Sequence, residues 1–212
     1  MTAVAVLEKS ESTAVQTSVR AMGLLRPIAA PNDVLVAQNE TRAMVKEALK
    51  KDRDYGVIPG TDKAALLKPG AERLALAFGL APRFRIVEHE IDHDRKVTWV
   101  KRKKVWNNKF RGDKSFTYAE EAGASLGLYR YVVECEMVHR ESGTVVAACL
   151  GACSSMESKY VDRPRDVENT ILKMGEKRAQ VGAVILALGL SDEFTQDTSA
   201  RRSVPDFETT QT

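Results

Sequence analysis

His89 and His93 have the spacing that most directly suggests chemistry, because His89-Glu90-Ile91-Asp92-His93 fits the H-E-x-x-H pattern of zinc proteases. That chemistry requires a helix, which places both imidazoles on one face so that they bind the same ion while the glutamate activates its water. The flanking residues are β-formers, and in a strand rising about 3.3 Å per residue the two histidines lie about 13 Å apart. We therefore expect a hairpin end and no metal site, and a zinc hydrolase using His89, Glu90 and His93 is the less favoured alternative.

A basic stretch interleaved with aromatic residues indicates a different chemistry, the binding of a polyanion. Residues 95–114 contain nine Lys or Arg and one acid, a net charge of +8, whereas residues 191–212 contain five acids and two arginines. Basic side chains neutralise phosphates and aromatic rings stack on bases, so the stretch is a candidate nucleic-acid contact. The alternative is a long hairpin whose lysines only protect an exposed strand edge. The candidate residues lie between Trp99 and Trp106 and are Lys101, Arg102, Lys103 and Lys104.

A second basic group falls near the end of the chain, where apolar residues at helical spacing predict a long helix. Lys173 and Lys177 lie one turn apart on this helix, and Arg178 follows them on its apolar stripe. A free charge on that stripe is costly, so we expect Arg178 to reach out of the core to a partner. The alternative is a structural residue that pairs with a nearby acid, such as one in a loop.

Other chemical motifs are weaker. The segment Gly56 to Lys63 lacks the G-x-x-x-x-G-K-[ST] spacing of a phosphate loop, and Cys135, Cys149 and Cys153 fit no common metal framework, so we interpret the cysteines as buried thiols. No catalytic triad or Cys-His pair can be assembled from the sequence. We expect no cofactor and no covalent catalysis.

The elements that position these residues follow an α+β order. Residues 83–91 and 96–106 are predicted to be paired strands joined by a polar turn at 92–95, and Tyr129 to Arg140 alternates apolar and polar residues as a half-buried strand does. Glu141, Ser142 and Gly143 then make a turn into a return strand over 144–151. We expect an antiparallel β-meander of three to four strands packed on a C-terminal helix over 167–190.

Two further helices are predicted before the strands. The first covers about 33–51, N-capped by Asn32 or Asp33, and a loop spans 54–68. The second is short, with Pro69 in its first turn and Gly79 at its C-terminal end. Its expected buried residues are Leu74, Ala77 and Phe78.

Length and composition set the outer limits. The 212 residues are 43% hydrophobic, which suffices for one core, and we divide the chain into a flexible segment 1–30, a core domain 31–197 with a basic insertion at about 95–127, and a flexible tail 198–212. The longest apolar run, 181–190, is too short for the roughly 20 residues of a membrane span. Three cysteines and the absence of a long apolar N-terminal run predict a reducing cytoplasm.

The order of three sequence blocks resembles the Rad-fifty-two-like single-strand annealing proteins of homologous recombination, including their phage-encoded relatives. The resemblance covers about 54–197. Its blocks are Leu67-Lys68-Pro69-Gly70-Ala71-Glu72-Arg73-Leu74 running into Phe78-Gly79-Leu80; Tyr131-Val132-Val133-Glu134-Cys135-Glu136-Met137 with the Ser142-Gly143 turn; and Glu168-Asn169-Thr170-Ile171-Leu172-Lys173-Met174 with Lys177-Arg178-Ala179. Gly151 to Tyr160 and Phe194 to Asp197 are similar to segments of the phage proteins.

This resemblance implies ATP-independent binding of single-stranded DNA and annealing of complementary strands, with protomers joined into a ring or a helical filament. By motif match, Lys177 and Arg178 would contact the DNA backbone and Tyr55 would lie near it. The arginine expected shortly after that tyrosine is not evident, and Lys63 or Lys68 stands in its place as a candidate.

The expected partners are therefore single-stranded DNA and further copies of the chain, in the cytoplasm of a bacterial host. A host single-strand-binding protein or a phage exonuclease is a further candidate, with the acidic tail as its contact or as a solubilising segment. A non-annealing nucleic-acid-binding regulatory module is the main alternative.

Overall fold

The computed structural model describes residues 27–57, 63–106 and 116–195. The predicted flexible segment lies almost wholly outside the described residues, as do the predicted tail and the central part of the basic insertion. The elements follow in the order α1 (Pro31–Ala48), β1 (Tyr55–Val57), β2 (Ala64–Leu66), α2 (Lys68–Ala77), β3 (Leu80–Trp106), β4 (Phe116–His139), β5 (Val145–Ser154), the short 3₁₀ helix η1 (Pro164–Asp166) and α3 (Glu168–Leu188).

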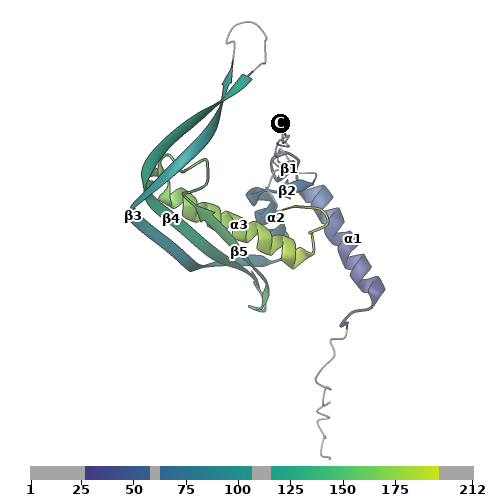
Figure 1. The fold of residues 1–212 in the computed structure, drawn as a ribbon. Helices are drawn as coiled ribbons and strands as arrows, with labels where there is room; N and C mark the ends of the chain where they lie inside the picture. The colour runs from purple at the N-terminus through teal and green to yellow at the C-terminus, as the bar shows by residue number, and fades with distance from the viewer. Residues whose placement is uncertain (1–26, 58–62, 107–115, 196–212) are drawn as a thin grey trace, which may run out of the picture.

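The predicted α+β class is confirmed: β3, β4 and β5 form a three-stranded antiparallel sheet, with β4 in the centre and α3 across one face (Figure 1). The alternation read from the sequence of β4 sets this arrangement, because every second residue from 129 to 137 points to the α3 side and is buried. These residues are Tyr129, Tyr131, Val133, Cys135 and Met137. The predicted turn after β4 is also present, with Gly143 at a positive φ of 68°.

The predicted turn at residues 92–95 is wrong. β3 is one strand of 27 residues that runs through this point, and its partner is β4 along the whole length. The polar residues instead make an irregularity between Asp92 and Lys96, where the Asp94 N–H donates to the Asp92 carboxylate at 3.1 Å as in a turn. A bulge of this kind sharpens strand twist and bends the sheet. We call residues 92–96 the elbow.

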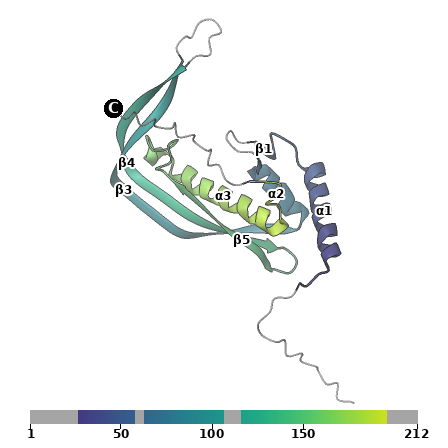
Figure 2. The ribbon, with the colours of Figure 1, turned by 45° about the vertical axis from the view of Figure 1, so that its right-hand side comes forward.

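Beyond the elbow the hairpin continues as a two-stranded projection, which we call the arm (residues 96–106 of β3 and 116–126 of β4). Figures 1 and 2 both show the arm standing away from the body above the N-terminal end of α3. Trp99 lies across Gly123 on the paired strand: a Cβ at that glycine would be 2.5 Å from the Trp99 ring. The arm thus has a large, half-buried aromatic residue near its base, and none of the arm residues whose exposure the structure describes is fully buried.

α3 lies close to the sheet because glycines occupy the contact between the helix and β5. A Cβ at Gly151 would stand 2.3 Å from the Ala179 nitrogen and 2.4 Å from the Gly175 oxygen, so only glycine allows this approach. The helix ends at Gly189, whose φ of 63° is the left-handed conformation common at helix C-termini. The predicted C-terminal helix is therefore confirmed to within two residues at each end.

The remaining elements depart from the sequence predictions in detail. α1 begins after Ala30 and no side chain caps it, so the predicted Asn32 or Asp33 cap is wrong. None of the 18 residues of α1 is buried. The predicted loop at 54–68 contains the antiparallel pair β1–β2, whose three-residue strands are too short to give a periodic signal. In α2, Leu74 is buried as predicted, but Ala77 is exposed and Ala71 and Ala75 are buried instead, because α2 turns that face to α3.

Among the described residues, no helix is both long enough and apolar enough to span a membrane.

Candidate nucleic-acid interface

Lys173 and Lys177 lie on the face of α3 that is turned away from the sheet. Gly175 and Ala179 contact the sheet, and a residue two positions away in an α-helix points in nearly the opposite direction. Lys173 is exposed and Lys177 is half-buried. Within the described ranges, neither ammonium group has an acidic partner within salt-bridge distance. The predicted pair of lysines one turn apart therefore presents two uncompensated charges on one surface.

Arg178, although adjacent in sequence, points to a different place. Its guanidinium donates to both carboxylate oxygens of Glu157, at 2.6 and 3.0 Å, and to the Ala152 carbonyl on β5 at 2.6 Å. The geometry therefore matches the structural alternative for Arg178, because its guanidinium forms a bidentate ion pair with Glu157, an acid in a loop. The pair holds the segment after β5 against α3.

The pKa of the Glu157 carboxyl group is lowered by this pairing. Burial alone would raise its pKa, but hydrogen bonds from Arg178 and Cys153, together with the charges of Arg178 and Lys159, lower the pKa to about 2. The pKa of Arg178 is raised, chiefly by the same hydrogen bond with Glu157. The two groups thus remain ionised together at neutral pH.

The basic residues of the arm divide between its two faces. Lys101 faces α3 and pairs with Asp162 at 2.7 Å, with its ammonium 5.5 Å from the centroid of the Trp99 ring. Arg102 points to the opposite face and pairs with Glu120 at 3.2 Å. Lys103 follows Lys101 by two residues, so it shares the α3 side, and it is exposed. For Lys104 the structure gives only its backbone pairing with Tyr118.

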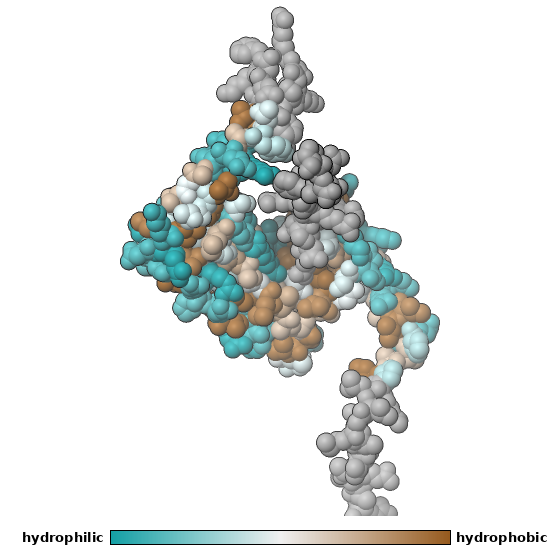
Figure 3. Space-filling view, in the orientation of Figure 1, coloured by the Kyte–Doolittle hydropathy of each residue, from teal (hydrophilic) through white to brown (hydrophobic). Residues whose placement is uncertain are grey.

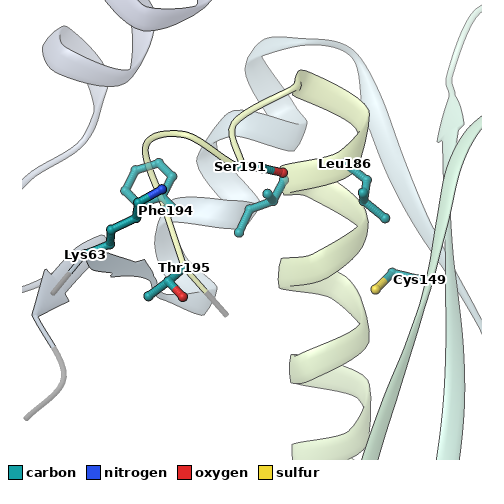
Figure 4. Close-up of a pocket in the computed structure, with 7 residues that line it drawn as sticks. Lys63, Cys149, Leu186, Ser191, Phe194 and Thr195 are labelled. Carbon is teal, nitrogen blue, oxygen red and sulfur yellow. The ribbon is translucent and has the colours of Figure 1, made fainter. Parts of the chain in front are cut away.

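The candidates in the first half of the chain form a separate group. Tyr55 in β1 packs against Phe194, with ring centroids 5.9 Å apart. Lys68 starts α2 and pairs with Glu72 at 3.5 Å, and Lys63 is an exposed residue that precedes β2. Lys63 also lines a shallow pocket of about 340 Å³ between β5 and the C-terminal end of α3 (Figure 4). Nothing in these contacts joins them to the lysines of α3.

The outer face of the sheet, opposite α3, is electrostatically self-compensated. Its arginines point across to acids on the neighbouring strand or near the elbow, and hydrophilic residues cover much of this side near the elbow (Figure 3). Ion pairs of this exposed kind stabilise little, but they leave no net positive surface for a polyanion. The pairs are Arg83–Glu136, Arg85–Glu134, Arg130–Glu88, Arg95 with Glu90 and Asp92, and Arg102–Glu120.

A segment that the sequence did not single out joins the arm to the body. We call residues 161–165 the clasp. The Ser125 hydroxyl donates to the Val161 carbonyl at 2.5 Å, Asp162 pairs with Lys101, and Arg165 donates to the His93 carbonyl at 2.8 Å. These contacts link residues 36 to 72 positions apart, so no local pattern could have indicated them.

The two histidines of the H-E-x-x-H match lie in β3, not in a helix. His93 shares a hydrogen bond of 2.9 Å with the Tyr129 hydroxyl, and His89 stacks on Tyr131 with centroids 6.5 Å apart. Tyr131 in turn donates to Glu168 at 2.9 Å, and burial followed by that carboxylate raises the pKa of Tyr131 to about 12. Across residues 27–57, 63–106 and 116–195 no group of three potential metal ligands occurs.

The cysteines are free thiols in the sheet and in the α3 interface. Cys135 and Cys153 are buried and Cys149 is partly exposed. Burial raises the pKa of Cys135 to about 12 and that of Cys153 to about 11, so neither forms a reactive thiolate at neutral pH. Most of the phosphate-loop-like segment, residues 58–62, lies outside the described part of the chain.

Comparisons with known proteins do not place the chain in a family: no family model, no curated protein and no solved structure matches it.

Proposed function

We propose that the chain binds single-stranded DNA on the α3 side of its sheet and anneals complementary strands without ATP, as a Rad-fifty-two-like homo-oligomer. The observation that carries the proposal is the contrast between the two sides. The outer arginines are matched by acids, whereas Lys103, Lys173 and Lys177 on the α3 side have no acidic partner among the described residues.

The mechanism needs no bond-making group. Lysines neutralise the phosphates of one strand, which lowers the repulsion that opposes the approach of a second strand. Binding through the backbone leaves base edges available, so base pairing between the strands supplies the sequence specificity. A protein of this kind is not an enzyme in the covalent sense and requires no cofactor.

Assembly into a ring or filament is part of the proposal. β3 and β5 are both edge strands of the sheet, and both carry exposed apolar residues, among them Phe84 and Ile86 on β3 and Val146 and Leu150 on β5. Two different edges of one chain can make head-to-tail contacts, which close into rings or continue as filaments. Repetition of the protomer would then join the lysine-bearing surfaces into a longer track.

Annealing of two complementary oligonucleotides, one carrying a fluorophore and the other a quencher, tests the proposal in a buffer without ATP. We expect the protein to accelerate pairing, and electron microscopy of the same sample to contain rings or filaments. Tight binding of single strands with no acceleration would support the non-annealing binding module instead. No binding of single strands would refute the proposal altogether.

A further inference from the structure

The clasp contains one positively charged side chain, Arg163, that takes part in none of the contacts described above. On either side of it, Asp162 is tied to the arm through Lys101 and Arg165 to the elbow through the His93 carbonyl. Arg163 lies between them, is exposed, and makes no side-chain hydrogen bond or ion pair within the described structure. An arginine without a partner in so firmly anchored a segment is available to an external ligand.

The backbone around Arg163 is fixed. Pro164 follows it, is buried, and begins the 3₁₀ helix η1. Arg163 itself has φ −144° and ψ 60°, and its N–H donates to the Tyr160 carbonyl at 3.0 Å. The Arg163 position is therefore set by the fold, although its side chain is exposed. Such a residue loses less conformational freedom on binding than one in a flexible loop.

In the chain, Arg163 lies between the contact with the arm and the start of the helix that carries the second group of lysines. Through Asp162 the clasp touches the α3 side of the arm, where Lys101 and Lys103 lie, and five residues beyond Arg163 the helix α3 begins and leads to Lys173. The views in Figures 1 and 2 agree that the N-terminal end of α3 lies at the base of the arm. The pKa of Asp162 is lowered mainly by its hydrogen bond with Lys101, and the nearby charge of Arg163 also lowers it.

We propose that Arg163 binds a phosphate of single-stranded DNA and thereby joins the arm lysines and the α3 lysines into one basic track. The inference rests on the proposed function and adds to it a residue and a path for the strand across the base of the arm. A phosphodiester suits the site because a guanidinium donates two parallel hydrogen bonds to phosphate oxygens. An acidic peptide, the other polyanion of similar charge, is tested as a competing outcome.

The test uses the full chain and a fluorescent 30-nucleotide strand, with binding followed by anisotropy over a range of KCl concentrations. Arg163→Ala is expected to weaken binding by about 3- to 10-fold and to reduce the slope of log K against log salt by about 0.7, the value for one phosphate contact with a single strand. Arg163→Lys is expected to restore the slope but only part of the affinity. Arg102→Ala, which removes one positive charge from the outer face, is the matched control and should change neither quantity.

The outcomes separate the inference from the proposed function. If the wild-type chain binds no single strand, the proposed function fails; if it binds and Arg163→Ala leaves affinity and slope unchanged, only the inference fails. Loss of affinity together with a lower unfolding temperature in both Arg163→Ala and Arg163→Gln would make Arg163 a structural residue and overturn the inference. Weakened binding of poly-glutamate with unchanged binding of DNA would assign Arg163 to an acidic protein and would also overturn it.

Discussion

Arg178 is the residue for which a structural role and a DNA-binding role predict opposite results. If its guanidinium holds Glu157, then Arg178→Ala removes a bidentate ion pair and leaves a partly buried carboxylate without a partner. The lowering of the Glu157 pKa from 4.5 to about 2 corresponds to about 3 kcal/mol at about 1.36 kcal/mol per pKa unit. Because the Arg178 side chain is 38% exposed, water screens the pair, and we expect a loss of about 1–2 kcal/mol in the free energy of unfolding.

Urea denaturation at pH 7 measures this loss, and the expected decrease in the midpoint is about 0.5–1 M. The neighbouring Lys177→Ala is the matched control: it removes the same charge one position away and should leave the midpoint nearly unchanged while weakening DNA binding. Arg178→Ala with unchanged stability and abolished DNA binding would refute the structural assignment.

The same pair predicts a dependence on pH. The folded-state pKa of Glu157 lies below its ordinary value of 4.5, so its contribution to stability is present above that pH and is lost as the pH falls toward 2. The wild-type chain should therefore lose more stability between pH 5 and pH 2 than Glu157→Gln does. Equal losses in the two proteins would show that the pair contributes no stability.

Two further substitutions test the packing. Gly151→Ala places a methyl group against the backbone of α3 and should cost about 1–3 kcal/mol or more, whereas Ala148→Val on the exposed face of the same strand should cost little; equal urea midpoints for the two variants would contradict the described packing of α3 on the sheet. Gly123→Ala should displace the Trp99 ring from the arm and shift its fluorescence to longer wavelength, measured in a Trp106→Phe background; an unchanged emission maximum would mean that the ring does not lie across Gly123.

The sequence predicted the central strand and the last helix well because both are local signals. The alternation from Tyr129 to Met137 repeats every two residues, and Gly189 ends α3 in the left-handed conformation that glycine favours. The prediction failed at residues 92–95, where the same polar residues serve a turn or a bulge, and a partner strand 30 to 36 residues away decides between them.

The candidate site was predictable only in part. The sequence placed Lys173 and Lys177 on one helix, and their shared exposed face follows from helical geometry. It could not reveal that Arg178 is paired, because Glu157 lies 21 residues earlier in a loop with no periodic pattern. Strand alternation puts Lys101 and Lys103 on the face opposite to Arg102, but the sequence could not show which of the two faces meets Asp162. Such long-range pairs are a property of the folded chain.

The central claim is that DNA binds on the α3 side of the sheet, and the salt dependence of binding for two variants of equal charge tests it most directly. Lys173→Ala with Lys177→Ala removes two positive charges from the α3 side, and Arg83→Ala with Arg102→Ala removes two from the outer face. For the first variant we predict a salt slope smaller by about 1.4 and loss of annealing, with the assembly intact, and for the second a slope equal to that of the wild type. Equal effects of the two variants, or a larger effect of the outer pair, would contradict the account.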